Sequence, residues 1–222
     1  MFKEIDASPF EFDSMFYDQE FEIILCKITL CYQMMIKNVV KVPSDENKIR
    51  NILLLKYLKN DKIREEVGLL DYLFDREVPE DKTPGRTDIK IQTKNTFIYQ
   101  EAYYIIECKR LNNQNLNGTS GLNAEYIKEG IMRFVINQYS IYYRVNGMIG
   151  FVVEDMDIEQ NIENINTLLI NHFPKANATA IINKASFIEN FEYQYFSIHQ
   201  DKNNSLFKLY HLMFDFSNQI EK

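Results

Sequence analysis

Three polar side chains lie at the ends of two apolar segments of this chain, and their types and spacing are those of a site that can hold a cation. Asp88 opens the segment "DIKIQ", and Glu107 and Lys109 close the segment "YYIIECK". Glu107 and Lys109 are two residues apart, so in a strand both project from one face while Cys108 projects from the other. Two adjacent strands joined by a turn would therefore place two carboxylates and an ammonium side by side.

Such a group of side chains has a defined chemistry. Carboxylates are hard oxygen ligands that suit Mg²⁺, which binds one or two of them together with waters and a substrate phosphate. The bound ion lowers the pKa of a water and stabilises the charge that develops at phosphorus. Lys109 could orient or help to deprotonate that water, or neutralise the developing charge. The pattern thus indicates hydrolysis of a phosphate ester.

The elements that would position these residues alternate between helix and strand. Helices are expected at 18–40, 44–60, 124–144 and 158–173, and strands at 87–92, 102–108, 147–153, 193–200 and 206–217. Ser44 is a plausible N-cap for the second helix. A helix between two apolar strands predicts a right-handed crossover, so we expect an α/β fold with a mixed central β-sheet flanked by helices.

The two segments resemble the metal-dependent PD-(D/E)xK nuclease superfamily, which has the restriction-endonuclease-like fold. The stretch "GRTDIKI" followed by "IIECKR" is similar to its motif, in which an Asp begins one strand and Glu-x-Lys ends the next; Thr87 stands in place of the motif's Pro. The resemblance covers about 44–155. It implies a single domain, 1–222, in which a helical segment, 1–42, and a β-rich extension, 160–222, pack on a nuclease-like core.

The resemblance also implies roles for individual residues. Asp88 and Glu107 would hold Mg²⁺, or Mn²⁺ as a substitute, with the backbone carbonyl of Cys108 as a possible further ligand. Lys109 would act on the attacking water. Glu46, in the first turn of the expected second helix, matches a further catalytic acid that many members carry.

Three other residues are candidates for contact with nucleic acid. Gln138 and Tyr142 have the Gln-x-x-x-Tyr spacing that RecB-like members carry on the helix after the Glu-x-Lys strand, and Arg110 could clamp a phosphate. Simpler interpretations stay open: Gln138 as a core amide bonded to backbone, Arg110 as a solvated side chain, and Glu46 as a helix-dipole acid with Arg50 four residues on.

Composition limits the class of protein. The chain has 222 residues, a net charge of −7 and a pI near 5.1, which argues against non-specific coating of DNA. Three cysteines, an odd number without metal-finger spacing, predict reduced thiols and a cytoplasmic protein. Charged residues interrupt the most apolar segment, 21–40, and the first residues lack the pattern of a signal peptide, so we expect no membrane span and no leader. The three histidines are interpreted as structural.

We therefore predict a Mg²⁺-dependent nuclease that hydrolyses phosphodiester bonds of DNA in restriction, phage defence or repair, with a homodimer as a modest expectation. One alternative is a non-catalytic binding subunit of the same fold within a larger nucleic-acid-processing or defence complex, which the acidic pI favours. Another is a structural α/β protein whose charged strand ends are merely solvated. That alternative predicts that Asp88, Glu107 and Lys109 do not converge.

Overall fold

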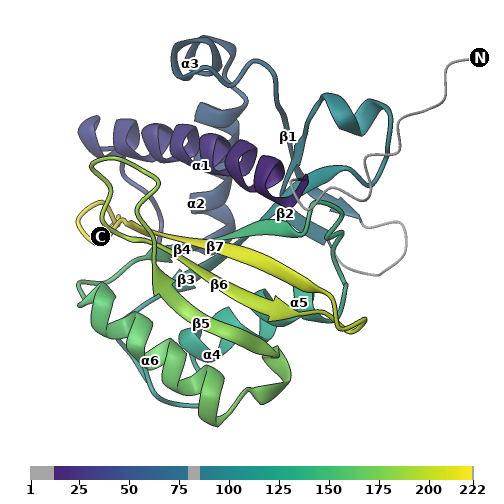
Figure 1. Cartoon of the computed structure of the whole chain (residues 1–222). Helices are drawn as coiled ribbons and strands as arrows, with labels where there is room; N and C mark the ends of the chain where they lie inside the picture. The colour runs from purple at the N-terminus through teal and green to yellow at the C-terminus, as the bar shows by residue number, and fades with distance from the viewer. Residues whose placement is uncertain (1–12, 80–85, 222) are drawn as a thin grey trace, which may run out of the picture.

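One seven-stranded sheet forms the centre of the molecule, with strand order β1-β2-β3-β4-β7-β6-β5 (Figure 1). The computed structural model describes residues 13–79 and 86–221. Gly85 of the motif stretch and the first twelve residues, on which the expectation of no leader rests, lie outside them. The strands are β1 Leu73–Pro79, β2 Arg86–Gln92, β3 Tyr103–Leu111, β4 Val145–Val152, β5 Ala178–Lys184, β6 Gln194–Gln200 and β7 Leu206–Asp215.

The sheet is mixed, as predicted. β3, β4 and β7 are parallel neighbours at its centre, and the outer pairs on both sides are antiparallel. β4 is buried along its whole length, as expected for a parallel strand that is covered on both faces. Because β7 pairs with β4, the C-terminal strands extend the same sheet.

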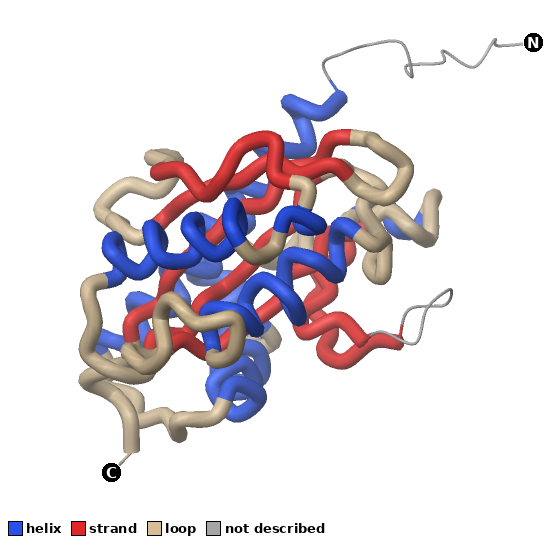
Figure 2. Tube along the Cα trace, turned by 90° about the horizontal axis from the view of Figure 1, so that it is seen from below, coloured by secondary structure: helices blue, strands red, loops and turns tan. Residues whose placement is uncertain are grey.

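Helices cover both faces of the sheet. Their bounds are α1 Asp13–Lys37, α2 Glu46–Leu53, η1 Leu54–Leu58, α3 Asp61–Val67, η2 Lys94–Phe97, α4 Leu122–Tyr126, η3 Ile127–Ile131, α5 Met132–Val135, α6 Ile158–Asn171 and η4 Pro174–Ala176. One hydrophobic core packs α1 and α2 against the sheet, and a second packs α4, α5 and α6 against the opposite face. The view from below shows the helices of this second layer crossing the strands (Figure 2).

Helix α1 is long but belongs to the core. Phe21, Ile24 and Ile28 are fully buried on its inner face, and Gly147 of β4 lets the Phe21 ring approach the sheet, since a Cβ there would lie 3.0 Å from it. Among the described helices, none combines the length and the apolar character that crossing a bilayer requires. All three cysteines are free thiols, with Cys31 and Cys108 buried and Cys26 partly buried.

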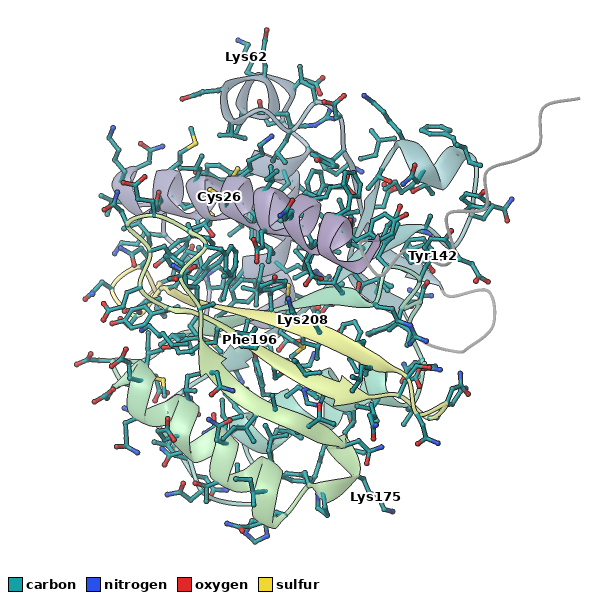
Figure 3. All side chains as sticks on the ribbon, viewed as in Figure 1. Cys26, Lys62, Tyr142, Lys175, Phe196 and Lys208 are labelled. Atoms are coloured by element: carbon teal, nitrogen blue, oxygen red, sulfur yellow. The ribbon has the colours of Figure 1, made fainter. Side chains whose placement is uncertain are left out.

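The helix expected at 124–144 is shorter than predicted. It consists of α4, the π-helical turn η3 and α5, and it ends at Val135. Asn137 then takes a left-handed conformation with φ 54°, which stops the helix. The placement of Gln138 and Tyr142 on this helix is therefore wrong. Both lie in the following loop, where Tyr142 is exposed (Figure 3). The Tyr142 ring stacks on Tyr99 of the β2–β3 connection.

The expected helix 44–60 divides into α2 and the π-helical η1. The short helix α3, which follows it, and the strands β1 and β5 were not predicted. β1 and β5 form the two edges of the sheet. β5 is mostly exposed, so its sequence lacks the apolar run that marks a buried strand, which explains why it was missed.

Two buried histidines join β6 and β7 through one chain of hydrogen bonds. His199 Nδ1 donates to the carbonyl of Ala176, so its Nε2 accepts from Ser197 Oγ at 2.7 Å. The Ser197 hydroxyl therefore accepts from His211 Nε2 at 2.8 Å, and His211 Nδ1 accepts from the Tyr126 hydroxyl. These directions hold for neutral imidazoles, each of which has one donor and one acceptor nitrogen. Burial lowers the pKa of His199 to about 4 and that of His211 to about 3.

Acid should destabilise the fold through these histidines. Between pH 6.5 and 4 the unfolded chain binds protons at His199 and the folded chain does not, so stabilisation present above pH 6.5 is lost as pH falls towards 4. A shift of this size corresponds to about 3 kcal/mol. We expect the loss of unfolding free energy between pH 6.5 and 4, measured in urea, to be smaller by about that amount in His199→Asn. Equal losses in variant and wild type would contradict this.

Candidate active site

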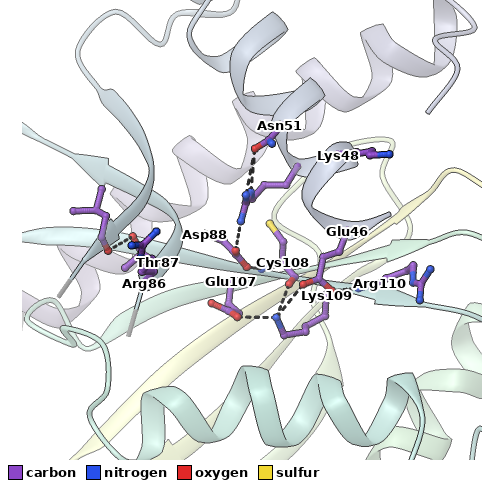
Figure 4. Close-up of polar contacts among 12 residues, drawn as sticks. Glu46, Lys48, Asn51, Arg86, Thr87, Asp88, Glu107, Cys108, Lys109 and Arg110 are labelled. Atoms are coloured by element: carbon purple, nitrogen blue, oxygen red, sulfur yellow. Dashed lines mark hydrogen bonds and ion pairs between the residues drawn. The ribbon is translucent and has the colours of Figure 1, made fainter. Parts of the chain in front are cut away.

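Asp88, Glu107 and Lys109 converge where the β2–β3 ladder stops (Figure 4). Regular pairing between the two strands ends at the pair Ile89–Ile106. Beyond it, the Asp88 carboxylate replaces a backbone partner and accepts from the N–H of Cys108 at 2.8 Å. Beyond the last strand pair, the backbone N–H groups on this edge of β3 can donate to side chains. The first acceptor is the carboxylate of Asp88, the Asp of the predicted motif.

Glu46 accepts a hydrogen bond from the next free backbone N–H on the same edge of β3, that of Arg110. It lies in the first turn of α2, after the N-cap Asp45, and its Oε2 accepts from the N–H of Arg110 at 2.8 Å. Two backbone donors spaced two residues apart thus bind two carboxylates, one from β2 and one from α2. The Arg110 guanidinium donates to the carbonyl of Ser44 at 2.7 Å, so it joins the end of β3 to the segment that leads into α2.

The Lys109 ammonium lies among three oxygen atoms. Its Nζ is 2.8 Å from Glu107 Oε1, 2.9 Å from the carbonyl of Cys108 and 3.2 Å from Glu46 Oε1. The residue is only 7% exposed. Burial by itself lowers the pKa of Lys109, but the carboxylates of Glu107 and Glu46, with Asp88, outweigh it and hold the pKa above its ordinary value. The amine is therefore charged at neutral pH.

Glu107 is fully buried and accepts from three side chains. Besides Lys109, its Oε1 contacts Arg133 of α5 at 2.8 Å, and its Oε2 accepts from the Tyr139 hydroxyl at 2.7 Å. Burial, followed by the nearby charge of Asp88, raises the pKa of Glu107 to about 7, while Lys109 and Arg133 oppose the rise. An added cation would relieve this effect, because it would stabilise the charged form of Glu107.

Arg50 binds Asp88, a contact that sequence spacing did not indicate. Arg50 is 2% exposed, and its guanidinium contacts Asp88 Oδ1. The spacing of four suggested a helical pair of Glu46 with Arg50; the structure shows ion pairs of Glu46 with Lys109 and of Arg50 with Asp88. Arg50, Arg133 and Tyr139 are thus site residues beyond the predicted set. Tyr139 had no signal in the sequence, since the loop conformation after α5 brings it to Glu107.

The structure separates the predicted residues into two groups. Asp88, Glu107, Lys109, Glu46 and the Cys108 carbonyl form one connected cluster (Figure 4). The expectation of the purely structural alternative, that the motif side chains face separate regions, is therefore wrong. Tyr142 lies beside Tyr99, at the opposite end of the β2–β3 hairpin from Asp88, and the tyrosine that contacts Glu107 is Tyr139.

The oxygen donors suit Mg²⁺ by type, but in the structure protein cations engage them. Asp88, Glu107 and the Cys108 carbonyl are hard ligands of the kind that Mg²⁺ prefers. Across 13–79 and 86–221, no group of three or more His, Cys, Asp or Glu side chains is arranged to hold a metal ion. The contacts give a reason, since Arg50 binds Asp88 while Lys109 and Arg133 bind Glu107. An incoming ion has to take over some of these contacts.

The fold and site together define a mixed α/β protein with a buried cluster of acids and basic residues at the end of two neighbouring strands. Comparison with protein-family models, with curated proteins and with solved structures found no match to this chain. The geometry of this cluster is therefore the basis on which a function can be proposed.

Tyr139→Phe should destabilise the protein by about 1–2 kcal/mol, because it removes a buried hydrogen bond to a carboxylate and keeps the ring. Tyr99→Phe is the matched control: Tyr99 is 57% exposed, so its change should stay within about 0.5 kcal/mol. Urea denaturation of the two variants and the wild type measures both effects. Equal stabilities of the two variants would show that the Tyr139–Glu107 bond contributes little.

Proposed function

We propose that this protein is a Mg²⁺-dependent nuclease of the PD-(D/E)xK type that hydrolyses phosphodiester bonds of DNA. The observation that carries the proposal is the cluster of Asp88, Glu107, Lys109 and the Cys108 carbonyl around one point at the end of β2 and β3. The path of the chain through β2, β3, the helical segment 122–135 and β4 is similar to that of the family, in which a helix and a further strand follow the Glu-x-Lys strand.

Asp88, Glu107 and the Cys108 carbonyl would hold the ion, with Mn²⁺ as a substitute for Mg²⁺. When bound, the ion supplies a more acidic water and stabilises charge on the phosphoryl group. Lys109, charged at neutral pH, can donate a hydrogen bond to the attacking water or to a phosphate oxygen, so its raised pKa favours this donor role over that of a general base. Glu46 orients Lys109 through its contact with Nζ.

Access to the cluster comes through its less buried members. Glu107 is fully buried, whereas the side chain of Glu46 is 29% exposed and that of Arg133 is 25% exposed. A phosphate would thus approach from the side of α2 and α5. Arg110, partly buried at the end of β3, remains our candidate for a phosphate contact. Gln138 and Tyr142 lie in the loop after α5, so the helical spacing that suggested them as nucleic-acid contacts does not apply.

A second function is a non-catalytic binding subunit of a nucleic-acid-processing or defence complex. The observation in its favour is that Arg50, Lys109 and Arg133 already engage the acids of the cluster. Titration calorimetry separates the two functions, because the binding subunit predicts no Mg²⁺ or Mn²⁺ binding that depends on Asp88.

A cytoplasmic location and a homodimer are part of the nuclease proposal. Light scattering measures the oligomeric state.

The cleavage assay tests the proposal directly. We expect the purified protein to cleave at least one DNA form among supercoiled, linear duplex and single-stranded substrates in Mg²⁺ or Mn²⁺, and to cleave none in EDTA. An RNA of the same sequence tests the choice of sugar. If all these substrates stay intact in both metals, and calorimetry detects no bound ion, the nuclease proposal is wrong.

A further inference from the structure

The proposed metal ligands are Asp88, Glu107 and the Cys108 carbonyl, and the Lys109 ammonium contacts the last two of them. Its closest contacts are Glu107 Oε1 and the Cys108 carbonyl, at 2.8 and 2.9 Å. A Mg²⁺ ion binds such oxygens at about 2.1 Å, inside the volume that the ammonium fills. Two cations on the same buried pair of oxygens would repel strongly. The ammonium and a divalent ion therefore exclude each other at these two atoms.

Only one carboxylate of the cluster is suited to receive a displaced ammonium. Asp88 is engaged through Oδ1 by Arg50 and through Oδ2 by the N–H of Cys108. Glu46 is anchored through Oε2 by the N–H of Arg110, and its Oε1 faces Lys109 at 3.2 Å, the longest of the three Nζ contacts. Glu46 is thus fixed in place with one oxygen available for a closer contact.

The movement required of Lys109 is confined to the end of its side chain. The stem passes the η3 turn, where a Cβ on Gly130 would lie 3.7 Å from Lys109 Cγ. The backbone is held in the parallel ladder between β3 and β4, where Lys109 pairs with Gly150. A rotation about the outer carbon–carbon bonds carries Nζ from Glu107 towards Glu46 without a change in the sheet.

We propose that Lys109 is an internal competitor of the metal: its ammonium closes the free site by occupying Glu107 and the Cys108 carbonyl, and Glu46 receives it when a divalent cation binds. This inference rests on the proposed function and adds to it a regulation of the same site. It gives a role to the contacts of Lys109 with Glu107 and the Cys108 carbonyl in the free protein. It also makes Glu46 a positioning residue, because it acts through Lys109.

Metal affinity tests the inference independently of activity. We expect Lys109→Met, and Lys109→Gln as a second variant that keeps hydrogen-bonding groups, to bind Mn²⁺ at least about tenfold more tightly than the wild type in titration calorimetry. Lys48→Met is the matched control. Lys48 is an exposed lysine of α2 close to Glu46 (Figure 4), so its loss removes the same charge from outside the cluster and should change the affinity by less than about twofold.

Glu46→Gln tests the second half of the inference. It should weaken Mn²⁺ binding several-fold in the presence of Lys109, because the displaced ammonium loses its partner, and by a smaller factor in the Lys109→Met background. This is a double-mutant cycle with the metal affinity as its readout. An equal effect of Glu46→Gln in both backgrounds would remove Glu46 from the proposal.

The outcomes separate this inference from the proposed function. If the wild type binds Mn²⁺ in a manner that Asp88→Asn abolishes, but both folded Lys109 variants bind no more tightly than the wild type, the competition is refuted and the metal site stands. If the Lys109 variants bind and the wild type does not, the competition is supported in its strongest form. If neither binds Mn²⁺, both proposals are wrong. Circular dichroism establishes that each variant is folded.

Discussion

Asp88→Asn should reduce the rate of metal-dependent DNA cleavage by about a thousandfold or more, because a ligating charge that contributes several kcal/mol to the transition state is lost. Asparagine is nearly isosteric and keeps an oxygen that can accept from the N–H of Cys108. The edge of β3 should therefore stay ordered while the metal loses its ligand. Initial cleavage rates at saturating Mg²⁺ and Mn²⁺ measure the effect.

Asp75→Asn is the control for this variant. Asp75 lies on β1 and pairs at 3.1 Å with Lys59, where both side chains are about 40% exposed, so the same chemical change is made on the same sheet but outside the cluster. Its cleavage rate should equal that of the wild type. Since Asp88→Asn leaves the buried Arg50 less well paired, the rates are compared at a temperature at which both variants are folded. Equal rates for the two variants would exclude Asp88 from the reaction.

Arg50→Met should destabilise the fold by about 3 kcal/mol or more. The guanidinium is almost fully buried, and the side chain of Asp88 is 14% exposed, so removal of one partner leaves a poorly solvated charge. Methionine fills most of the volume, which limits the contribution of a cavity. Urea denaturation at pH 7 measures the change in unfolding free energy.

The exposed pair of Lys59 and Asp75 provides the comparison for Arg50→Met. Lys59→Met breaks an ion pair in solvent and should cost at most about 1 kcal/mol. The double variant Arg50→Met/Asp88→Asn should recover much of the loss, because it leaves no unpaired buried charge and the asparagine keeps an oxygen that can accept from the N–H of Cys108. A loss in Arg50→Met no larger than that in Lys59→Met would show that the buried pair does not hold the site together.

Two features could be predicted from the sequence: the shared face of Glu107 and Lys109 on β3, and the mixed β-sheet. Glu107 and Lys109 are two residues apart, and strand geometry requires them to share a face wherever the strand lies. The apolar runs of β3 and β4, with a helical segment between them, predicted a parallel pair. These features depend on local spacing, which a single segment carries by itself.

The C-terminal end of the helix after β3 and the edge strand β5 could not be predicted from the sequence. The apolar spacing of 127–135 continues in appearance to Tyr142, but the chain turns at Asn137 in a left-handed conformation. β5 became a strand by pairing with β6 at the edge of the sheet, although few of its side chains are buried. In both places the tertiary environment outweighs a weak local preference.

The sequence by itself determined the three acids and the amine of the site: an Asp near the start of a strand, a Glu and a Lys on one strand face, and a Glu in the first turn of a helix. Only the tertiary structure decided how these groups are paired. Arg50 binds Asp88, Lys109 contacts Glu46, and Tyr139 reaches Glu107 from a loop. The physical reason is that partners of a buried charge are chosen by which donors the packed elements bring within hydrogen-bonding distance, and sequence separation does not encode that distance.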